Sequence, residues 1–374
     1  MPAQIDFNIS QKFRCWFFLS MLMLLFVHSY NLNQRYLQPF TIVDERLTIT
    51  SFVQYFFSNG LFRFFVPLFF SISGYLYAAH DNRSYRKSIG KRFQNLVLPY
   101  LIWSAWGLLL TYALELSSYG RHVVLTTQLM TLSHNRILLH DYKWYEIILR
   151  WILLPVSYQL WFLRVLFIYN LAYPALRWAV QSHAKIIFAI LILFWLSEIG
   201  FLFVEGEGLL FFSLGIWLQK KDFNIQAPNK WLRPVPWGIA FVIIAAFKTI
   251  LAFKGFGFIG NAVFPLLLLL HKTVVCSGLI AAWFGSGPLV RWFMAKKWFV
   301  QLCPFSFMIY VLHAPLVAYA INALLPLVPQ VADWRLVVYM LLPLALLLFC
   351  VLTALIIKIT FPKMYSVMTG GRGI

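Results

Sequence analysis

A histidine near the far end of a long apolar segment is the first residue in this chain with a type and position suited to chemistry. Every residue between Arg14 and His28 is apolar except Ser20. The segment is long enough to cross most of a hydrocarbon core about 30 Å thick as a helix. Because an ionisable side chain in a spanning helix is costly, it usually faces a protein interior or a water-filled cavity. His28 is therefore a candidate buried proton acceptor, and the alternative is an interfacial histidine that caps the span.

The composition indicates that this segment belongs to a membrane protein. Of 374 residues, 61% are hydrophobic and only 11% are charged. A soluble domain has about 25% charged residues, so most of this chain must face lipid or other spanning helices. The net charge of +19 is explained by cationic loops that set membrane orientation and contact lipid headgroups, and we expect no nucleic-acid partner. The four cysteines show no metal-ligand spacing, so we expect no metal and no bound cofactor.

Apolar runs separated by charged or Pro/Gly-rich breaks predict an all-α polytopic membrane protein with a bundle of about ten transmembrane helices. We expect one integral-membrane domain over residues 1–374, with no soluble second domain. The first span is expected to be retained, because residues 28–30 form no small-x-small cleavage site. The predicted spans are 13–31, 61–79, 93–115, 159–179, 186–204, 208–219, 236–253, 259–284, 299–322 and 336–357.

The distribution of lysine and arginine predicts the orientation. If the N-terminus is cytoplasmic, roughly twice as many of these cations fall in inside segments as in outside segments, as expected for the positive-inside rule. Every inside segment is then basic, including the loop 83–92. We therefore expect both termini to be cytoplasmic.

Six aromatic and aliphatic motifs follow one another along nearly the whole chain. They are FVHSYN at 26–31, RFFVPLFFSISGYLYA at 63–78, KRFQNLVLPYLIW at 91–103, LWFLRVLFIYNLAYPAL at 160–176, FFSLGIWL at 211–218 and FSFMIYVLHAPL at 305–316. In order and spacing they resemble the membrane-bound acyltransferase family 3. The resemblance implies transfer of an acyl group, often acetyl, from a cytoplasmic acyl-CoA to a hydroxyl of a carbohydrate or glycolipid acceptor at a bacterial inner membrane.

The chemistry implied by this resemblance needs few groups. A carbohydrate hydroxyl is a poor nucleophile until a base takes its proton as it attacks the thioester, and histidine can accept a proton at neutral pH. We expect His28 to be this general base. The developing oxyanion needs hydrogen-bond donors, for which Arg63 is the strongest candidate and Ser71, Ser73 and Tyr75 are others. For Ser73 and Gly74, close helix packing by small residues is the favoured interpretation.

The first span departs from the family's spacing. Its members usually carry an arginine with ten residues between it and the histidine, and Phe17 occupies that position here. The nearest cation is Arg14, almost one helical turn earlier, on nearly the same face and about 4.5 Å closer to the cytoplasm. Arg14 could replace the family's arginine as a catalytic cation. The alternative is a snorkelling arginine that only sets the topology.

Other intramembrane polar residues are assigned positioning or substrate-binding roles. His313 lies in a span with Pro304 and Pro315, so we expect a kink whose freed backbone carbonyls it could satisfy. Trp161 and Arg164, in LWFLR, resemble a family motif and could line the substrate pocket together with His313 and Tyr75. Among the embedded cations Arg164, Lys248 and Lys272, one could pair with Glu198, but the sequence does not select the partner.

We therefore expect a membrane O-acyltransferase whose partners are acyl-CoA, a carbohydrate or glycolipid acceptor and membrane lipid. The alternative is an exporter or flippase for a polysaccharide or its precursor, because an aromatic-lined bundle with internal cations would also suit a sugar path. A membrane scaffold without activity is a third possibility. Loss of the acetyl-CoA thioester in the presence of purified protein would discriminate the enzyme from both.

Overall fold

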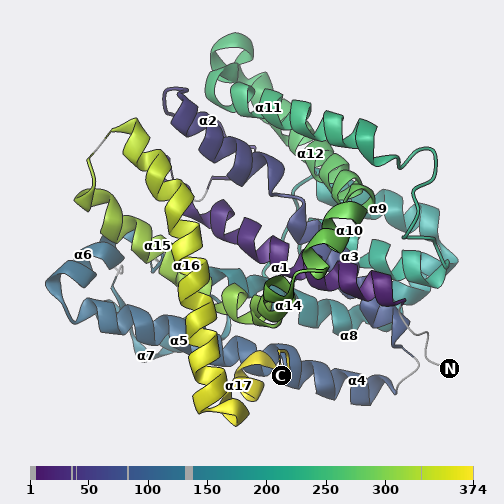
Figure 1. Ribbon diagram of the computed structural model, residues 1–374, viewed down its shortest axis with the longest axis horizontal. Helices are drawn as coiled ribbons and strands as arrows, with labels where there is room; N and C mark the ends of the chain where they lie inside the picture. Colours follow the sequence, from purple (N-terminus) through teal and green to yellow (C-terminus); the bar gives the residue numbers. More distant parts are fainter. Residues whose placement is uncertain are drawn as a thin grey trace. The chain divides into compact units, whose positions relative to one another are not determined.

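A computed structural model describes residues 6–34, 37–38, 40–81, 84–130, 138–329 and 331–373, except the side chain of residue 332. Every regular element longer than an isolated bridge in these residues is a helix (Figure 1). The predicted all-α class is therefore confirmed. The chain forms two compact units, and each unit draws on two separated stretches of sequence: residues 1–89 with 168–303, and residues 90–167 with 304–374.

The first helix shows how local sequence sets these boundaries. Helix α1 (Phe7–Ser29) begins where the Asp6 carboxylate accepts a hydrogen bond from the Asn8 amide at 2.7 Å, which satisfies one of the unpaired N–H groups of a helix start. It ends at Tyr30, whose backbone is extended. Between these points the chain is almost entirely apolar, so α1 is long enough to span a membrane.

The remaining helices of the first unit lie on both sides of a long insertion. They are α2 (Ile49–Tyr55), η1 (Phe56–Leu61), α3 (Phe65–Ala79), α9 (Ala184–Leu196), α10 (Gly206–Lys220), α11 (Pro234–Ile259), η5 (Gly260–Ala262), α12 (Val263–Gly285), α13 (Gly287–Met294) and α14 (Lys297–Leu302). Three helices cross a boundary between the units, namely α4 (Tyr85–Arg92), α8 (Trp161–Ser182) and η6 (Cys303–Phe305).

The second unit is built on α5 (Leu98–Glu115). Its indole and hydroxyl groups reach the backbone of neighbouring helices: Trp103 donates to the Met368 carbonyl at 2.9 Å and Tyr100 to the Ile152 carbonyl at 2.8 Å. The other helices are η2 (Phe93–Val97), α6 (Ser118–Thr127), η3 (Leu139–Asp141), α7 (Trp144–Ile152), η4 (Tyr158–Leu160), α15 (Ser306–Leu324), η7 (Leu325–Leu327), α16 (Ala332–Thr360) and α17 (Pro362–Thr369).

Six helical stretches are long and apolar enough to cross a membrane, so this is a multi-pass membrane protein. The segment Tyr158–Ser182 and helix α9 are bent by 119° relative to each other. They would add a seventh crossing if the bent pair forms one span. The count of ten spans is not confirmed by this test, because α9 and α10 are short and α11 and α12 form one continuous 52-residue stretch. The six stretches are Phe7–Ser29, Ile49–Ala79, Tyr85–Glu115, Pro234–Gly285, Lys297–Leu327 and Asp333–Thr360.

Two glycines bring α3 and α10 into backbone contact within the first unit. A Cβ atom at Gly74 would lie 2.1 Å from the Phe212 carbonyl oxygen, and one at Gly215 would lie 2.0 Å from the Ser71 carbonyl oxygen. Only glycine permits this approach from both sides. Close packing through small residues, which was the favoured interpretation of this part of the sequence, is confirmed at Gly74.

Helices α11 and α12 lie side by side (Figure 1). A Cβ atom at Gly278 would contact the Phe241 ring, and one at Gly285, the last residue of α12, would contact Pro234, the first residue of α11. The two helices therefore fold back on each other as an antiparallel pair.

The predicted kink in α15 is also present. Ala314 departs from helical geometry with φ −117° and ψ 138°, and the Ala314–Pro315 peptide bond is cis. A proline at this position removes a helical hydrogen bond and disfavours helical backbone in the preceding residue.

Candidate active site

The His28 end of α1 is fixed by hydrogen bonds to the next helices. His28 lies in the last turn of α1 and its side chain is half-buried. The Asn31 amide donates to Gln54 Oε1 at 2.8 Å, and Gln54 Nε2 donates to Asn31 Oδ1 at 2.9 Å. Ser58 Oγ donates to the Phe26 carbonyl at 2.9 Å. These contacts hold the backbone on either side of His28 against α2 and η1.

The segment η1 is a π-helix, a rare form that is frequent at functional sites. It carries Asn59, which is buried. The Asn59 side-chain oxygen accepts a hydrogen bond from the Arg63 guanidinium. The Asn59 backbone carbonyl accepts one from Lys248 Nζ at 2.7 Å. One residue of the π-helix therefore holds two cations from two different helical stretches.

Lys248, on α11, connects Asn59 to a histidine on α12. The Lys248 side chain is fully buried, and its Nζ lies 3.4 Å from Nδ1 of His271, which is 4% exposed. Nζ also lies 5.7 Å from the centre of the Tyr55 ring, within the range of a cation–π interaction. We refer to Tyr55, Asn59, Arg63, Lys248 and His271 as the Asn59 cluster.

The cluster reaches the end of α1 through Arg63. This guanidinium interacts electrostatically with the phenol groups of Tyr30 and Tyr55. Tyr30 follows His28 by two residues and caps the same helix. Ring contact between Phe26 and Phe62, with centroids 6.0 Å apart, joins the same two segments. His28 and Arg63 therefore belong to neighbouring ends of α1 and α3.

A second set of charged groups lies on α12, in the segment before α10 and in the first turn of α10. Lys272 forms an ion pair with Glu198, and its Nζ lies 4.7 Å from the centre of the Trp195 ring. The Trp195 indole donates to Glu207 Oε2 at 3.0 Å. The sequence left open whether one of the embedded cations Arg164, Lys248 and Lys272 pairs with Glu198, and the structure identifies Lys272 as its partner.

Arg14 and Tyr75 lie away from the Asn59 cluster. Arg14 and His28 are fourteen residues apart on the uninterrupted helix α1, or about 21 Å. The exposed Arg14 side chain donates to the Val300 carbonyl at 2.7 Å. Tyr75 contacts Phe13 edge-to-face, with ring centroids 5.9 Å apart. The structure thus groups Arg14 with Tyr75 at one end of α1 and His28 with Arg63 at the other.

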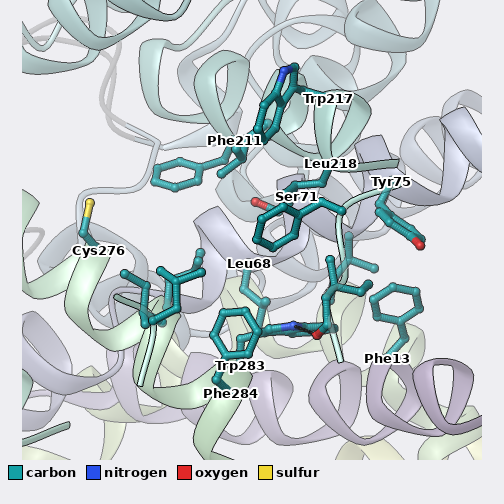
Figure 2. A pocket seen from close by; sticks show the side chains of 17 residues that line it. Phe13, Leu68, Ser71, Tyr75, Phe211, Trp217, Leu218, Cys276, Trp283 and Phe284 are labelled. Carbon is teal, nitrogen blue, oxygen red and sulfur yellow. Dashed lines mark hydrogen bonds between the residues drawn. The ribbon is translucent and has the colours of Figure 1, made fainter. Parts of the chain in front are cut away.

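Tyr75 lines an apolar cavity of about 350 Å³ in the first unit. Figure 2 shows Phe13, Leu68, Trp217 and Trp283 around this space, with the Ser71 hydroxyl as one of its few polar atoms. Apolar cavities of this kind do not hold water readily. The cavity is therefore suited to hydrocarbon rather than to a sugar.

Trp161, Arg164 and His313 all lie in the second unit. Trp161 begins α8, and its ring contacts Phe162, which in turn contacts Tyr310. Arg164 donates from Nη1 to the Leu153 carbonyl. These contacts account for the LWFLR motif as a link between the start of α8 and α15.

His313 and Gln159 stabilise the kink in α15. His313 is fully buried, and its Nδ1 donates to the Tyr310 carbonyl at 2.7 Å. Gln159 Nε2 donates to the carbonyls of Val311 at 3.1 Å and Ala314 at 3.0 Å. Backbone carbonyls freed by a kink need such partners in an apolar surrounding. This geometry supports the structural role of His313.

Among the residues that sequence reasoning missed are His271 and Gln159. Both are polar residues inside or beside apolar helices, and an intramembrane ionisable residue is by default a functional candidate. That signal was present for His271, which follows the apolar run VFPLLLLL. Its pairing with Lys248, from another helix, required the tertiary structure.

Within the described ranges, no group of three or more His, Cys, Asp or Glu side chains is placed to hold a metal ion. The polar groups brought together in the first unit are instead cations, a histidine, an amide and phenols. Such a set can take up a proton and stabilise negative charge on oxygen.

A multi-pass helical protein with this combination of groups is consistent with a membrane-bound transferase. The sequence profile of the family described as "Acyltransferase domain" matches residues 13–360. The chain therefore belongs to this acyltransferase family and is an O-acyltransferase.

The curated proteins include a relative with a similar sequence. It is the succinoglycan biosynthesis protein ExoH of Rhizobium meliloti (strain 1021), which is 26% identical over 265 residues, covering 70% of this chain and 67% of ExoH. No solved structure matches this chain.

Proposed function

We propose that this chain moves an acyl group, such as acetyl, from a cytoplasmic acyl-CoA to a hydroxyl of a polysaccharide or glycolipid in a bacterial inner membrane. The family supports the reaction class. The name of ExoH, a succinoglycan biosynthesis protein, supports a glycan as the acceptor. The chain would act as one integral-membrane domain.

In the proposed reaction, His28 takes the proton of the acceptor hydroxyl as the oxygen attacks the thioester carbonyl carbon. The guanidinium of Arg63 stabilises the negative charge that develops on the carbonyl oxygen. The carbon–sulfur bond then breaks, and the CoA thiolate leaves and takes the proton back from His28. No covalent acyl-enzyme is needed.

The observation that supports this proposal is the Asn59 cluster beside the His28 end of α1. Placing the fully buried Lys248 and the half-buried Arg63 among membrane-spanning helices is costly, and groups retained at that cost usually serve function. The cluster also rests on a π-helix, whose irregular backbone is typical of functional sites. Arg14 is retained in the proposal as a donor-binding cation at the cytoplasmic end of α1.

We also propose that all ten predicted segments cross the membrane. Each overlaps a helix, and α11 and α12 can cross separately because they fold back on each other. The proposed orientation places both termini and the loop before α4 on the cytoplasmic side.

The test uses purified protein in lipid nanodiscs with acetyl-CoA and a glucose oligosaccharide. Wild-type protein should release CoA thiol and acetylate the sugar, as measured by thiol titration and mass spectrometry. His28→Ala should lower the rate by about 10²- to 10⁴-fold, with membrane abundance near wild type and no rescue by more acetyl-CoA. His122→Ala, at an exposed histidine of α6, is the control. A fully active His28→Ala protein would remove His28 as the base.

A further inference from the structure

A pocket of about 390 Å³, lined by charged, polar and aromatic side chains, lies in the first unit, between the C-terminal half of α8, the end of α3 and the start of α4. Its volume is in the range of small-molecule and cofactor sites. The buried rings of Tyr77 and Tyr173 line it in a tilted contact, with ring centroids 4.4 Å apart and an interplanar angle of 48°. The proposed mechanism uses none of its residues.

The charges in this pocket do not cancel. The Asp81 carboxylate accepts hydrogen bonds from Arg177 Nη1 at 2.8 Å and from the Tyr173 hydroxyl at 2.5 Å. Lys220 Nζ lies 2.8 Å from the same carboxylate. One carboxylate therefore balances only one of two cations. Arg177 Nε also donates to Gln181 Oε1 at 3.1 Å, and the Arg177 side chain is 43% exposed. A guanidinium carries five N–H donors, so Asp81 and Gln181 use only some of them.

Asp81 is a carboxylate at neutral pH. Burial alone would raise the pKa of Asp81, but hydrogen bonds from Lys220 and Tyr173, and the charges of Lys220 and Arg177, outweigh burial and hold this pKa below its ordinary value. Asp81 therefore stays a charged partner of Arg177 and Lys220 at neutral pH.

Two exposed aromatic rings line the same pocket from different helices. Trp178 on α8 is 64% exposed and Tyr85 on α4 is 44% exposed. The Tyr85 hydroxyl donates to the Leu171 carbonyl at 2.7 Å, which holds the ring against α8. The next two residues, Arg86 and Lys87, are exposed cations on a helix whose sequence, YRKSIGKR, contains no acidic residue.

We propose that this pocket binds the adenine nucleotide end of the coenzyme A donor. The base stacks on Trp178 and Tyr85, and the phosphates are held by Arg177 together with Arg86 and Lys87. Aromatic faces bind any base through its π-surface, and arginine is suited to phosphate recognition. This assignment rests on the proposed function, in which the donor is a cytoplasmic acyl-CoA and this end of α3 faces the cytoplasm.

An anionic lipid headgroup would also satisfy the cations, and Trp and Tyr are common at membrane interfaces. A nucleotide engages both the cations and the rings within one pocket, because it carries phosphates and a planar base in one molecule. The pocket lies near the end of α3 opposite Arg63, so the nucleotide would bind at the cytoplasmic side while the thioester extends toward the membrane interior.

The experiment measures binding of coenzyme A itself, which has no acyl group to transfer, to the full chain in phosphatidylcholine nanodiscs. Trp178→Ala and Arg177→Gln should each weaken binding by roughly 5- to 100-fold, and Trp178→Phe should restore most of the loss. Adenosine 3′,5′-bisphosphate should compete with coenzyme A, and pantetheine should not. Trp231→Ala and Arg233→Gln, at exposed positions of another loop, should bind as wild type.

The outcomes distinguish an error in the pocket assignment from an error in the proposed acyl donor. If wild type binds coenzyme A and both pocket variants bind it equally well, the pocket assignment is wrong and the proposed function is unaffected. If wild type binds no coenzyme A, the donor is wrong and the pocket assignment fails with it. His28→Ala should bind coenzyme A normally, because binding does not use the base. Differences that appear only in nanodiscs containing phosphatidylglycerol would identify a headgroup site and overturn the proposal.

Discussion

At the scale of single residues, Asn59 links the functional candidates of the first unit. Its side chain and its carbonyl hold Arg63 and Lys248, and Lys248 continues to His271. Breaking a buried ion pair costs several kcal/mol because it leaves an uncompensated charge. Lys248 instead donates to a backbone carbonyl and lies beside a histidine, so an apolar side chain of similar size leaves no carboxylate unpaired there. This difference allows the structural and functional contributions of Lys248 to be separated.

We expect Lys248→Met to remain folded but to lose acyl transfer. Methionine fills a similar volume without the desolvation cost of a buried cation, so the thermal midpoint should stay near that of wild type. Without the Lys248 hydrogen bond, Asn59 and Arg63 are less well positioned, and kcat should fall on the order of 10- to 100-fold while KM changes little. Thiol release and thermal unfolding in nanodiscs measure both effects.

The control for this prediction is Lys254→Met. Lys254 lies on the same helix but is exposed, so neither activity nor stability should change. If Lys248→Met is as active as wild type, the Asn59 cluster only stabilises the fold, and Arg63 would have to act without support from Lys248.

The residues of the site were partly predictable from sequence. Glu198 was a candidate partner for an embedded cation because it is a rare carboxylate in an apolar region, but the choice of Lys272 needed the packing of α12 near Trp195. Lys248 and His271 are 23 residues apart on separate helices, so no helical periodicity relates them. Arg14 was positioned correctly by helical geometry relative to His28, whereas its contact with Val300 was not accessible from spacing.

At the scale of helices, the glycines of α3 and α10 explain two motifs that the sequence alone presented as soft apolar patterns. SISGYLY and FFSLGIWL each place a glycine where the backbone of the other helix passes. Because the contacting atoms are backbone carbonyls, they cannot move aside as a flexible side chain could. The close pair holds Phe70 and Phe212, both fully buried, against Tyr169 of α8.

We expect Gly74→Ala and Gly215→Ala to destabilise the protein strongly. The added Cβ would lie about 2 Å from a carbonyl oxygen in each case, and relief requires α3 and α10 to separate. Overpacking typically costs about 1–3 kcal/mol, and a backbone clash should reach or exceed the upper end. Membrane abundance and the thermal midpoint should both fall.

Gly90→Ala is the matched control, because a Cβ at this helical position meets no atom within 4 Å. It should be neutral or slightly stabilising, since alanine favours helix by up to about 1 kcal/mol over glycine. Wild-type stability of Gly74→Ala would contradict the close packing of α3 on α10.

The positions of helices were largely predictable because apolar length is a strong signal in membrane proteins. The kink in α15 also followed from its prolines. The sequence did not predict contacts between separate helices. Gln159 lies outside α15, yet its amide donates hydrogen bonds to the α15 carbonyls beside the kink. Short helices such as α10 were recognised as segments, but their length leaves their crossing of the membrane to experiment.

At the scale of the whole molecule, the proposals on the donor and on the base both depend on orientation. The acyl group of a cytoplasmic acyl-CoA must reach His28 and Arg63 from the cytoplasmic side. The pocket at Arg177 must therefore open to the cytoplasm. The positive-inside rule gives this orientation from the basic segments, of which α4 is the most concentrated.

Cysteine labelling at two exposed serines tests the orientation. Ser84 precedes α4 and Ser118 begins α6, and both are exposed. The four native cysteines, of which three are buried, are first replaced. In intact cells, an impermeant thiol reagent should label Ser118→Cys and leave Ser84→Cys unlabelled until the membrane is permeabilised, because α5 carries the chain across the bilayer between them. Labelling of Ser84→Cys alone in intact cells would show that the protein has the opposite orientation, and the pocket at Arg177 would then face away from cytoplasmic coenzyme A.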